Sequence, residues 1–166
     1  MNRSVQKLTR LALLTAVALI IYRFELLLPA PVPVPGIKLG LANIVTLIVL
    51  NRYGHRDAMF VLFCRVLLSF FFFGHAISLL YSLTGALCSL FIMTLSDKLL
   101  EKRFLYLTAV WGALSHNLAQ IAVALAITRT IWVAGYLPAL VISAILTGLF
   151  TGLCAHFTLK YLPKAQ

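Results

Sequence analysis

The sequence predicts an all-α integral membrane protein, and its composition, its segment lengths and the placement of its charges each support this class. Of its 166 residues, 62% are hydrophobic and only 11% are charged, and the mean hydropathy is +1.01. Soluble domains carry about 25% charged residues. A chain with so few polar side chains cannot cover a soluble globule, which excludes a soluble enzyme, a disordered tail and a disulfide-stapled secreted module. Helices satisfy their own backbone hydrogen bonds in a bilayer, so a helical bundle is expected.

Six apolar segments are expected to form a bundle of six transmembrane helices, in a single transmembrane domain that covers residues 1–166. A span needs about 20 residues, so six spans fill most of the chain and leave only short loops. The predicted segments cover residues 8–28, 38–51, 57–73, 75–96, 104–128 and 132–161.

The first segment is too long to be a removed signal peptide. An alternating run of prolines follows it, at Pro29, Pro31, Pro33 and Pro35. Because proline fixes φ and lacks an N–H donor, this run is predicted to be an extended loop. The second segment is short for a complete span, so we expect either a tilted helix or a longer helix that includes part of this loop.

The third, fourth and fifth segments are largely apolar runs, whereas the sixth is expected to begin irregularly, at Gly135 and Pro138. Within the sixth segment, glycines at 148 and 152 are four residues apart, and the first segment has the same spacing at Ala12 and Ala16. Small residues at this spacing let helices approach closely. Both pairs therefore predict helix contacts, either within the chain or with a partner.

Basic residues gather at one end of the predicted bundle. With the N-terminus inside, ten of the 14 Lys and Arg residues fall in the N-terminal arm, the second-to-third and fourth-to-fifth loops, and the C-terminus. Positive charge is retained in the cytoplasm, so both termini are predicted to be cytoplasmic, in a multi-pass protein of the bacterial cytoplasmic membrane. A nucleic-acid binder would gather these charges on one solvated face, so the net charge of +10 does not indicate nucleic-acid binding.

The sequence carries no recognisable catalytic set. Its four acidic residues, Glu25, Asp57, Asp97 and Glu101, offer no pair spaced to hold the magnesium ion that diphosphate chemistry needs. No Gly-x-x-x-x-Gly-Lys loop is present, so the chain is not expected to hydrolyse ATP. Cysteines stand singly in apolar runs and histidines are scattered. We therefore expect no catalytic residue, no metal and no cofactor.

The remaining polar residues predict a mostly apolar cavity with a basic mouth that favours an anion, on the outer side between helices four, five and six. Arg65 lies about 12 Å into the third segment at 1.5 Å per residue, where an Arg must face protein or a wet cavity. A structural pair, with a carbonyl or with Glu25, and a ligand contact both remain open for it. Asn117 and Gln120 share a helix face. The predicted ligand contacts are Lys38, Asn43, Arg65, His75, Tyr81, His116, Asn117, Gln120 and Arg129.

Plainer roles remain open for several of these residues. Basic residues near helix ends, such as Lys38 and Arg129, can extend to the lipid headgroups. A single histidine in a membrane helix is often a packing or interfacial residue.

Three stretches resemble a known family. They are residues 35–44 (PGIKLGLANI), residues 65–89 with SLTGAL at 82–87, and the tripeptide Ser115, His116 and Asn117. These stretches look like the family known as Gx transporter or heptaprenyl diphosphate synthase component I. That family is similar to the substrate-binding S-components of energy-coupling factor (ECF) importers.

The resemblance implies a six-helix membrane protein that captures a small molecule from outside, with a separate scaffold (T) subunit and two ATPase subunits as partners. Ala12 and Ala16 match the place where S-components contact the scaffold. The implied function is a substrate-binding subunit, not an enzyme, for a vitamin-like or anionic amphipathic molecule such as an isoprenoid or quinone precursor.

The alternative is a non-catalytic subunit or scaffold of a prenyl diphosphate synthase, because prenyl synthases need aspartate-rich metal sites that this chain lacks. Two further alternatives are weaker. A stand-alone secondary transporter would need an internal repeat with broken helices, and no clear one is found. A purely structural membrane partner would bind no small molecule.

Overall fold

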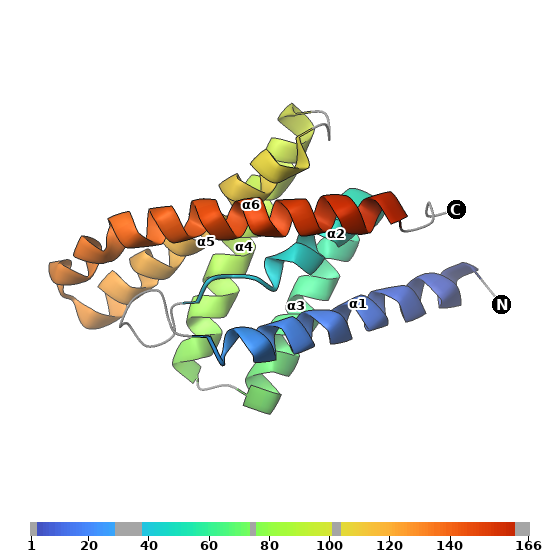
Figure 1. Ribbon diagram of the computed structural model, residues 1–166. Helices are drawn as coiled ribbons and strands as arrows, with labels where there is room; N and C mark the ends of the chain where they lie inside the picture. Colours follow the sequence, from blue (N-terminus) through green and yellow to red (C-terminus); the bar gives the residue numbers. More distant parts are fainter. Residues whose placement is uncertain (1–2, 29–37, 74–75, 101–103, 162–166) are drawn as a thin grey trace.

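The computed structural model confirms the all-α class within the residues that it describes, with six α-helices, one short 3₁₀ helix and no strand (Figure 1). It describes residues 3–28, 38–73, 76–100 and 104–161. The elements are α1 (Arg3–Glu25), α2 (Asn43–Tyr53), α3 (His55–Phe73), α4 (Ala76–Leu99), α5 (Leu105–Thr128), the 3₁₀ helix η1 (Ile131–Tyr136) and α6 (Leu137–Tyr161).

Among the described residues, four stretches are long and apolar enough to cross a membrane: most of α1, α4, α5, and η1 together with α6. α2 is too short for a complete span by itself, because its 11 residues reach only about 17 Å at 1.5 Å per residue, against a hydrocarbon core of about 30 Å; the prediction of six complete spans stays a prediction. α3 has 19 residues but carries three charges, Arg56, Asp57 and Arg65. Large apolar side chains on many helices face outward, among them Phe71 and Phe91, as expected for surfaces in contact with lipid.

Two helix boundaries differ from the predicted segments for local reasons. α1 ends at Glu25, because the backbone then tightens: Leu27 N–H donates to the Phe24 carbonyl and Leu28 N–H to the Glu25 carbonyl, each three residues back. α2 begins only at Asn43, so it does not extend into the proline run, whose four prolines lie outside the described residues. The irregular start predicted for the sixth segment is confirmed as η1, which leads directly into α6.

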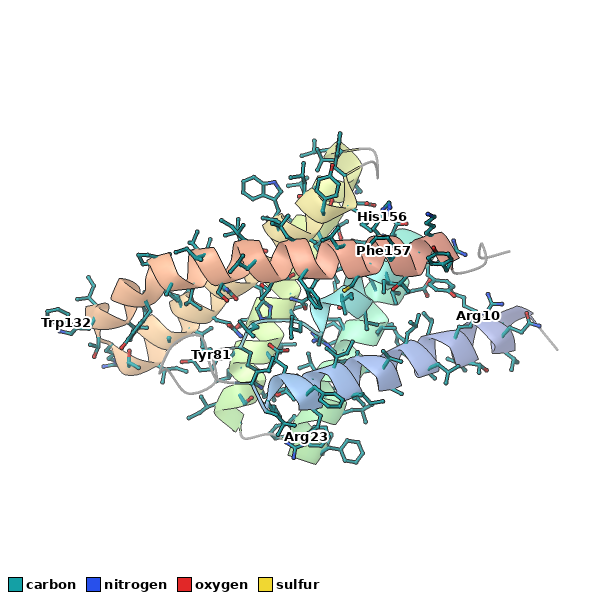
Figure 2. The ribbon with its side chains drawn as sticks, in the orientation of Figure 1. Arg10, Arg23, Tyr81, Trp132, His156 and Phe157 are labelled. Carbon is teal, nitrogen blue, oxygen red and sulfur yellow. The ribbon has the colours of Figure 1, made fainter. Side chains whose placement is uncertain are left out.

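The helices form a bundle in which α5 packs between α4 and α6, while α2 and α3 pack against each other and α1 lies against α3. Figure 1 shows the start of α1 and the end of α6 on one side of the molecule, and the junction of α5 with α6 on the opposite side. Figure 2 shows the same arrangement in the side chains: Arg10 and His156 lie on the side of the two chain ends, and Trp132 lies at the opposite tip.

Glycines bring α5 and α6 into close contact. A Cβ atom added at Gly148 would lie 2.6 Å from Val110 Cα, and one added at Gly152 would lie 2.6 Å from Tyr106 Cα. Real Cβ atoms do not approach backbone this closely, so the prediction of a close helix contact at these two glycines is confirmed. The contact is made within the chain.

Candidate functional site

Buried polar side chains from several helices converge on the short segment before α2. We call this group the polar cluster. It consists of Tyr22, Glu25, Lys38, Gly40, Asn43, Arg65, Ser78, His116 and Gln120.

Gly40 lies at the centre of the polar cluster. Its φ of +79° is in the left-handed region that favours glycine. A Cβ atom at this position would lie 3.1 Å from the Asn43 amide nitrogen and 3.1 Å from the His116 ring. The Gly40 N–H donates a hydrogen bond of 2.5 Å to Glu25 Oε1. The absence of a side chain at Gly40 thus lets α1, α2 and α5 bring polar groups together around one turn of backbone.

Lys38 connects this segment to three helices. Its ammonium group donates to the Tyr22 hydroxyl of α1 and to Ser78 Oγ of α4, the latter at 2.7 Å. The same ammonium lies 4.1 Å from the centre of the Tyr22 ring, an arrangement favoured by the ring's negative face. The Lys38 backbone N–H donates to Gln120 Oε1 of α5 at 3.2 Å. The side chain of Lys38 therefore binds α1 and α4, whereas its backbone binds α5.

Arg65 and Glu25 are both buried, with exposed fractions of 5% and 6%. They attract each other electrostatically, and Lys38 also attracts Glu25. One carboxylate thus attracts two cations. Of the other acidic residues, Asp57 pairs with Lys7 at 2.8 Å near the start of α1, and Asp97 lies in the last turns of α4. The described part of the polar cluster therefore keeps a net positive charge.

His116 is held tightly against this segment. Its Nδ1 accepts a hydrogen bond from the Asn43 amide nitrogen at 3.3 Å, and its ring also hydrogen bonds to the backbone of Gly85. A Cβ atom at Gly85 would lie 2.8 Å from the ring. Gly40 and Gly85 both leave room for the imidazole, so its position is fixed by packing as well as by hydrogen bonds.

Four buried hydrogen-bonding atoms in this region have no partner within the part of the chain that the structure describes. They are Asn43 Oδ1, Arg65 Nε, Asn117 Oδ1 and Gln120 Nε2. Leaving such an atom unpaired costs about 1–3 kcal/mol. Two are donors and two are acceptors, and three of them, on Asn43, Arg65 and Gln120, belong to the polar cluster.

The structure brings together five of the predicted ligand contacts: Lys38, Asn43, Arg65, His116 and Gln120. Asn117, one helical turn from Gln120, instead donates to the Leu140 carbonyl of α6 at 3.0 Å.

The other predicted contacts lie elsewhere. Tyr81 is buried among apolar residues of α5, η1 and α6. Arg129 is exposed at the end of α5. His75 lies outside the described residues. The polar cluster is built mainly by α1 to α5 and the segment before α2, whereas the sequence predicted a site between helices four, five and six.

Sequence reasoning missed Tyr22 and left Glu25 only as a possible partner of Arg65. A signal was nevertheless present, because the buried residues of α1 form one stripe with alternating spacings of four and three: Leu11, Thr15, Ala18, Tyr22 and Glu25. The stripe turns from apolar to polar toward the end of the helix. Arg23 is exposed and lies over the Phe73 ring at 5.6 Å (Figure 2), whereas Glu25 is buried, so these two residues face different ways.

A mainly apolar hollow lies away from the polar cluster. It has a volume of about 230 Å³ and lies between the first turns of α3 and the second half of α4, with Met59, Leu90 and Phe91 among its apolar walls and His55 and Lys98 among its polar ones.

The fold and the polar cluster together define a class: a helical protein with several helices long and apolar enough to cross a membrane and a buried, positively charged polar site. A family model described as heptaprenyl diphosphate synthase component I matches residues 14–158, so the chain belongs to that family. No curated protein and no solved structure matches the chain. The family predicted from the sequence is thus confirmed, whereas its likeness to ECF S-components stays a prediction.

Proposed function

We propose that this chain is a non-catalytic membrane subunit that binds an anionic, amphipathic small molecule at the polar cluster. The observation that carries this proposal is Arg65, which is buried with an unpaired Nε and is attracted, as Lys38 is, to the single carboxylate of Glu25. An incompletely compensated buried charge costs several kcal/mol. A bound anion would offset this cost, and the apolar helices around the polar cluster suit an apolar body.

The family description supports one use of such a subunit. It names a component I of a heptaprenyl diphosphate synthase, which implies a second component. In this use the chain is the membrane subunit, and its partner contributes the carboxylates that hold magnesium in prenyl transfer. The sequence supports this division of labour, since its four acidic residues offer no magnesium-binding pair.

A second use, as the substrate-binding subunit of an importer, is favoured by the position of the polar cluster. Glu25 lies about 27 Å along α1 from Lys7 at 1.5 Å per residue, on a helix whose start lies on the same side as the end of α6 (Figure 1). If both termini are cytoplasmic, as the positive-inside rule indicates, the polar cluster lies in the outer half of the membrane. A cytoplasmic synthase would have to reach a ligand there from the opposite side.

If the chain is an importer subunit, its expected partners are a membrane scaffold subunit and two ATPase subunits. Ala12 and Ala16 lie exposed on α1, so an ECF-type scaffold subunit could pack closely against them, with two ATPase subunits supplying the energy. This use fits a vitamin-like molecule, or an isoprenoid or quinone precursor, that arrives from outside the cell.

The binding proposal is tested with the purified chain in mild detergent. We expect anionic probes with an eight-carbon tail, octanoate or octyl diphosphate, to raise the apparent melting temperature more than the neutral probe octanol does. Arg65→Lys keeps the charge but removes Nε and should weaken this effect, whereas Lys98→Gln, at an exposed cation of the last turn of α4, should leave it unchanged. Equal shifts with anionic and neutral probes would refute the proposal.

The two uses are separated by reconstitution. A synthase component should raise the prenyl diphosphate synthase activity of a co-expressed catalytic component when the chain is added. An importer subunit should instead copurify with a membrane scaffold and two ATPases, and should support ATP-dependent uptake in proteoliposomes. Native mass spectrometry of the gently purified chain would identify a retained ligand in either case.

A further inference from the structure

We propose that the apolar hollow between α3 and α4 binds one anionic phospholipid, with an acyl chain along the hollow and the phosphate at Lys98 and His55. The hollow lies away from the polar cluster, so this site does not depend on the ligand proposed there. The length of the hollow, its apolar walls and the charge at its mouth each support this occupant.

The hollow extends along α4 for about the depth of one membrane leaflet. Its walls include Leu87 and Lys98, which are about 16 Å apart along the helix axis at 1.5 Å per residue. The whole hydrocarbon core is about 30 Å thick, so this length is close to half of it. The volume of about 230 Å³ exceeds the roughly 150 Å³ of a cavity that binds benzene. The hollow can therefore hold part of one hydrocarbon chain.

The walls of the hollow are apolar and partly open to the surroundings. Leu90 is 2% exposed and forms the floor, whereas Met59 and Phe91 are 37% and 70% exposed. The Thr94 hydroxyl donates to the Leu90 carbonyl, so its proton is already used within α4. An acyl chain could enter sideways from the lipid. Because lipid tails are as apolar as leucine, the selectivity of the site must come from the head group.

The mouth of the hollow lies at the end of the molecule that holds both chain ends. His55 begins α3, two residues before Asp57, which pairs with Lys7 near the start of α1 at 2.8 Å (Figure 1). Lys98 is exposed, and it makes no ion pair within the part of the chain that the structure describes. Asp97 precedes it but is buried and is not among the walls. The Lys98 ammonium is thus available to a phosphate, to which the His55 ring could also donate a hydrogen bond.

The predicted orientation favours an anionic lipid over a zwitterionic one. If both termini are cytoplasmic, the mouth lies at the inner leaflet, whose anionic lipids attract basic side chains near the membrane surface. Basic pockets between membrane helices on this side bind anionic head groups. A zwitterionic lipid offers the same phosphate, but its own cation would lie near Lys98. We therefore expect the hollow to prefer the lipid with a net negative charge.

The hollow and the polar cluster can be tested separately. A retained phospholipid fills the hollow, so octanoate and octyl diphosphate reach the polar cluster alone. Lys98→Gln removes the cation at the mouth, and the hollow of this variant has no preference for an anionic probe. The variant therefore changes lipid binding and leaves the polar cluster as it was.

The experiment is native mass spectrometry of the full chain in mild detergent, titrated with dioleoyl phosphatidylglycerol or dioleoyl phosphatidylcholine, which carry the same chains. We expect one phosphatidylglycerol per chain to be retained, with a dissociation constant about fivefold lower than that of phosphatidylcholine, the ratio expected for one cation near the membrane surface. Lys98→Gln should reduce this ratio to about one. Arg10→Gln, at an exposed cation on the side of the two chain ends (Figure 2), should keep it.

Met59→Trp tests the apolar part of the site. Its larger side chain would fill the hollow, and a residue 37% exposed tolerates the change without disturbing the buried core. We expect this variant to weaken both lipids by a similar factor, while its melting temperature without added lipid stays close to that of the unchanged chain. Unaltered binding of both lipids by the folded variant would overturn the inference.

Three further outcomes would also overturn the inference. Equal affinity of the unchanged chain for the two lipids would remove the role of the head-group charge. An equal loss of the preference in Arg10→Gln and Lys98→Gln would show a general attraction to the basic end instead of a site. Displacement of phosphatidylglycerol by glycerol 3-phosphate, or by lower concentrations of farnesyl diphosphate, would assign the hollow to a phosphate without chains or to a prenyl chain.

Discussion

The imidazole of His116 is packed so closely that two glycines decide where it can lie. Gly85 and Gly40 approach the ring from α4 and from the segment before α2, and each leaves no room for a methyl group without movement of a neighbour. A histidine held in this way keeps Asn43 in a fixed orientation through their shared hydrogen bond. At the residue scale, packing therefore determines which atoms of the polar cluster stay free.

Gly85→Ala should destabilise the protein by about 1–3 kcal/mol, the usual cost of overpacking, because the new Cβ would lie 2.8 Å from the His116 ring. Gly135→Ala is the matched control, since a Cβ there meets nothing within 4 Å. The apparent melting temperature in detergent is the measurement. Equal melting temperatures for the two variants would show that His116 moves aside without cost.

Glu25→Gln should cost about 1.5–3 kcal/mol, the range for a hydrogen bond to a charged group, because it neutralises the buried carboxylate that accepts the Gly40 N–H and attracts Arg65 and Lys38. Asp57→Asn removes a carboxylate whose partner Lys7 is 49% exposed. Such a surface pair contributes about 0–1 kcal/mol. Denaturant titration of both variants checks the contrast, and a larger loss for Asp57→Asn would contradict it.

Arg65, His116 and Gln120 could be singled out from the sequence because a polar side chain deep in an apolar helix needs a protein partner or a ligand. Their actual partners could not be predicted. Lys38 reaches Tyr22 and Ser78 only because the segment before α2 folds back across α1 and α4. The sequence pattern of a single helix carries no information on such a contact between distant segments.

Among the helices, the contact between α5 and α6 depends on glycine differently from the contact between α4 and α5. At Gly148 and Gly152 the nearest atoms to an added Cβ belong to the α5 backbone, whereas at Gly112 they belong to the flexible side chain of Met93. The α5 backbone can make room for an added Cβ only if the whole helix moves, whereas the Met93 side chain can make room by changing its rotamer.

Gly148→Ala and Gly152→Ala should therefore each lower the stability by about 2–3 kcal/mol, and Gly112→Ala should lower it by less than about half of that amount. Thermal unfolding of the three variants in the same detergent gives the comparison. The explanation fails if Gly112→Ala is the most damaging of the three.

The helices themselves were predictable to within a few residues, because long apolar runs can only be satisfied as helices in a bilayer. The start of α2 was less predictable, since residues 38–42 are as apolar as the helix that follows. Their conformation is set by a tertiary bond, Gly40 N–H to Glu25, and by the positive φ of Gly40. Hydrophobicity alone cannot distinguish such a segment from a helical turn.

At the scale of the whole molecule, orientation in the membrane decides from which side the polar cluster is reached. A Cys at Thr130, exposed after α5, should react with a membrane-impermeant maleimide added to intact cells, whereas a Cys at Gln6 should react only after lysis. The native cysteines at 64, 88 and 154 are first replaced by alanine. The reverse labelling pattern would place the polar cluster in the inner half of the membrane and would favour the synthase use.

The exposed small residues of α1 give a prediction about partners. Ala12→Leu and Ala16→Leu should change the apparent melting temperature by less than about 2 °C, because surface substitutions usually stay within about 0.5 kcal/mol, yet they should abolish copurification with a partner that packs closely there. Leu13→Ala, on the same exposed surface, is the control. Unchanged copurification in both leucine variants would remove α1 as the partner surface.

Lys38 belongs to no helix, yet its hydrogen bonds end on α1, α4 and α5. Hydrogen bonds from this single residue therefore fix the positions of three helices relative to one another along their axes. Lys38→Met would remove the two side-chain bonds, to Tyr22 and Ser78, while leaving each helix intact, so the variant should keep its helical content while its tertiary order loosens.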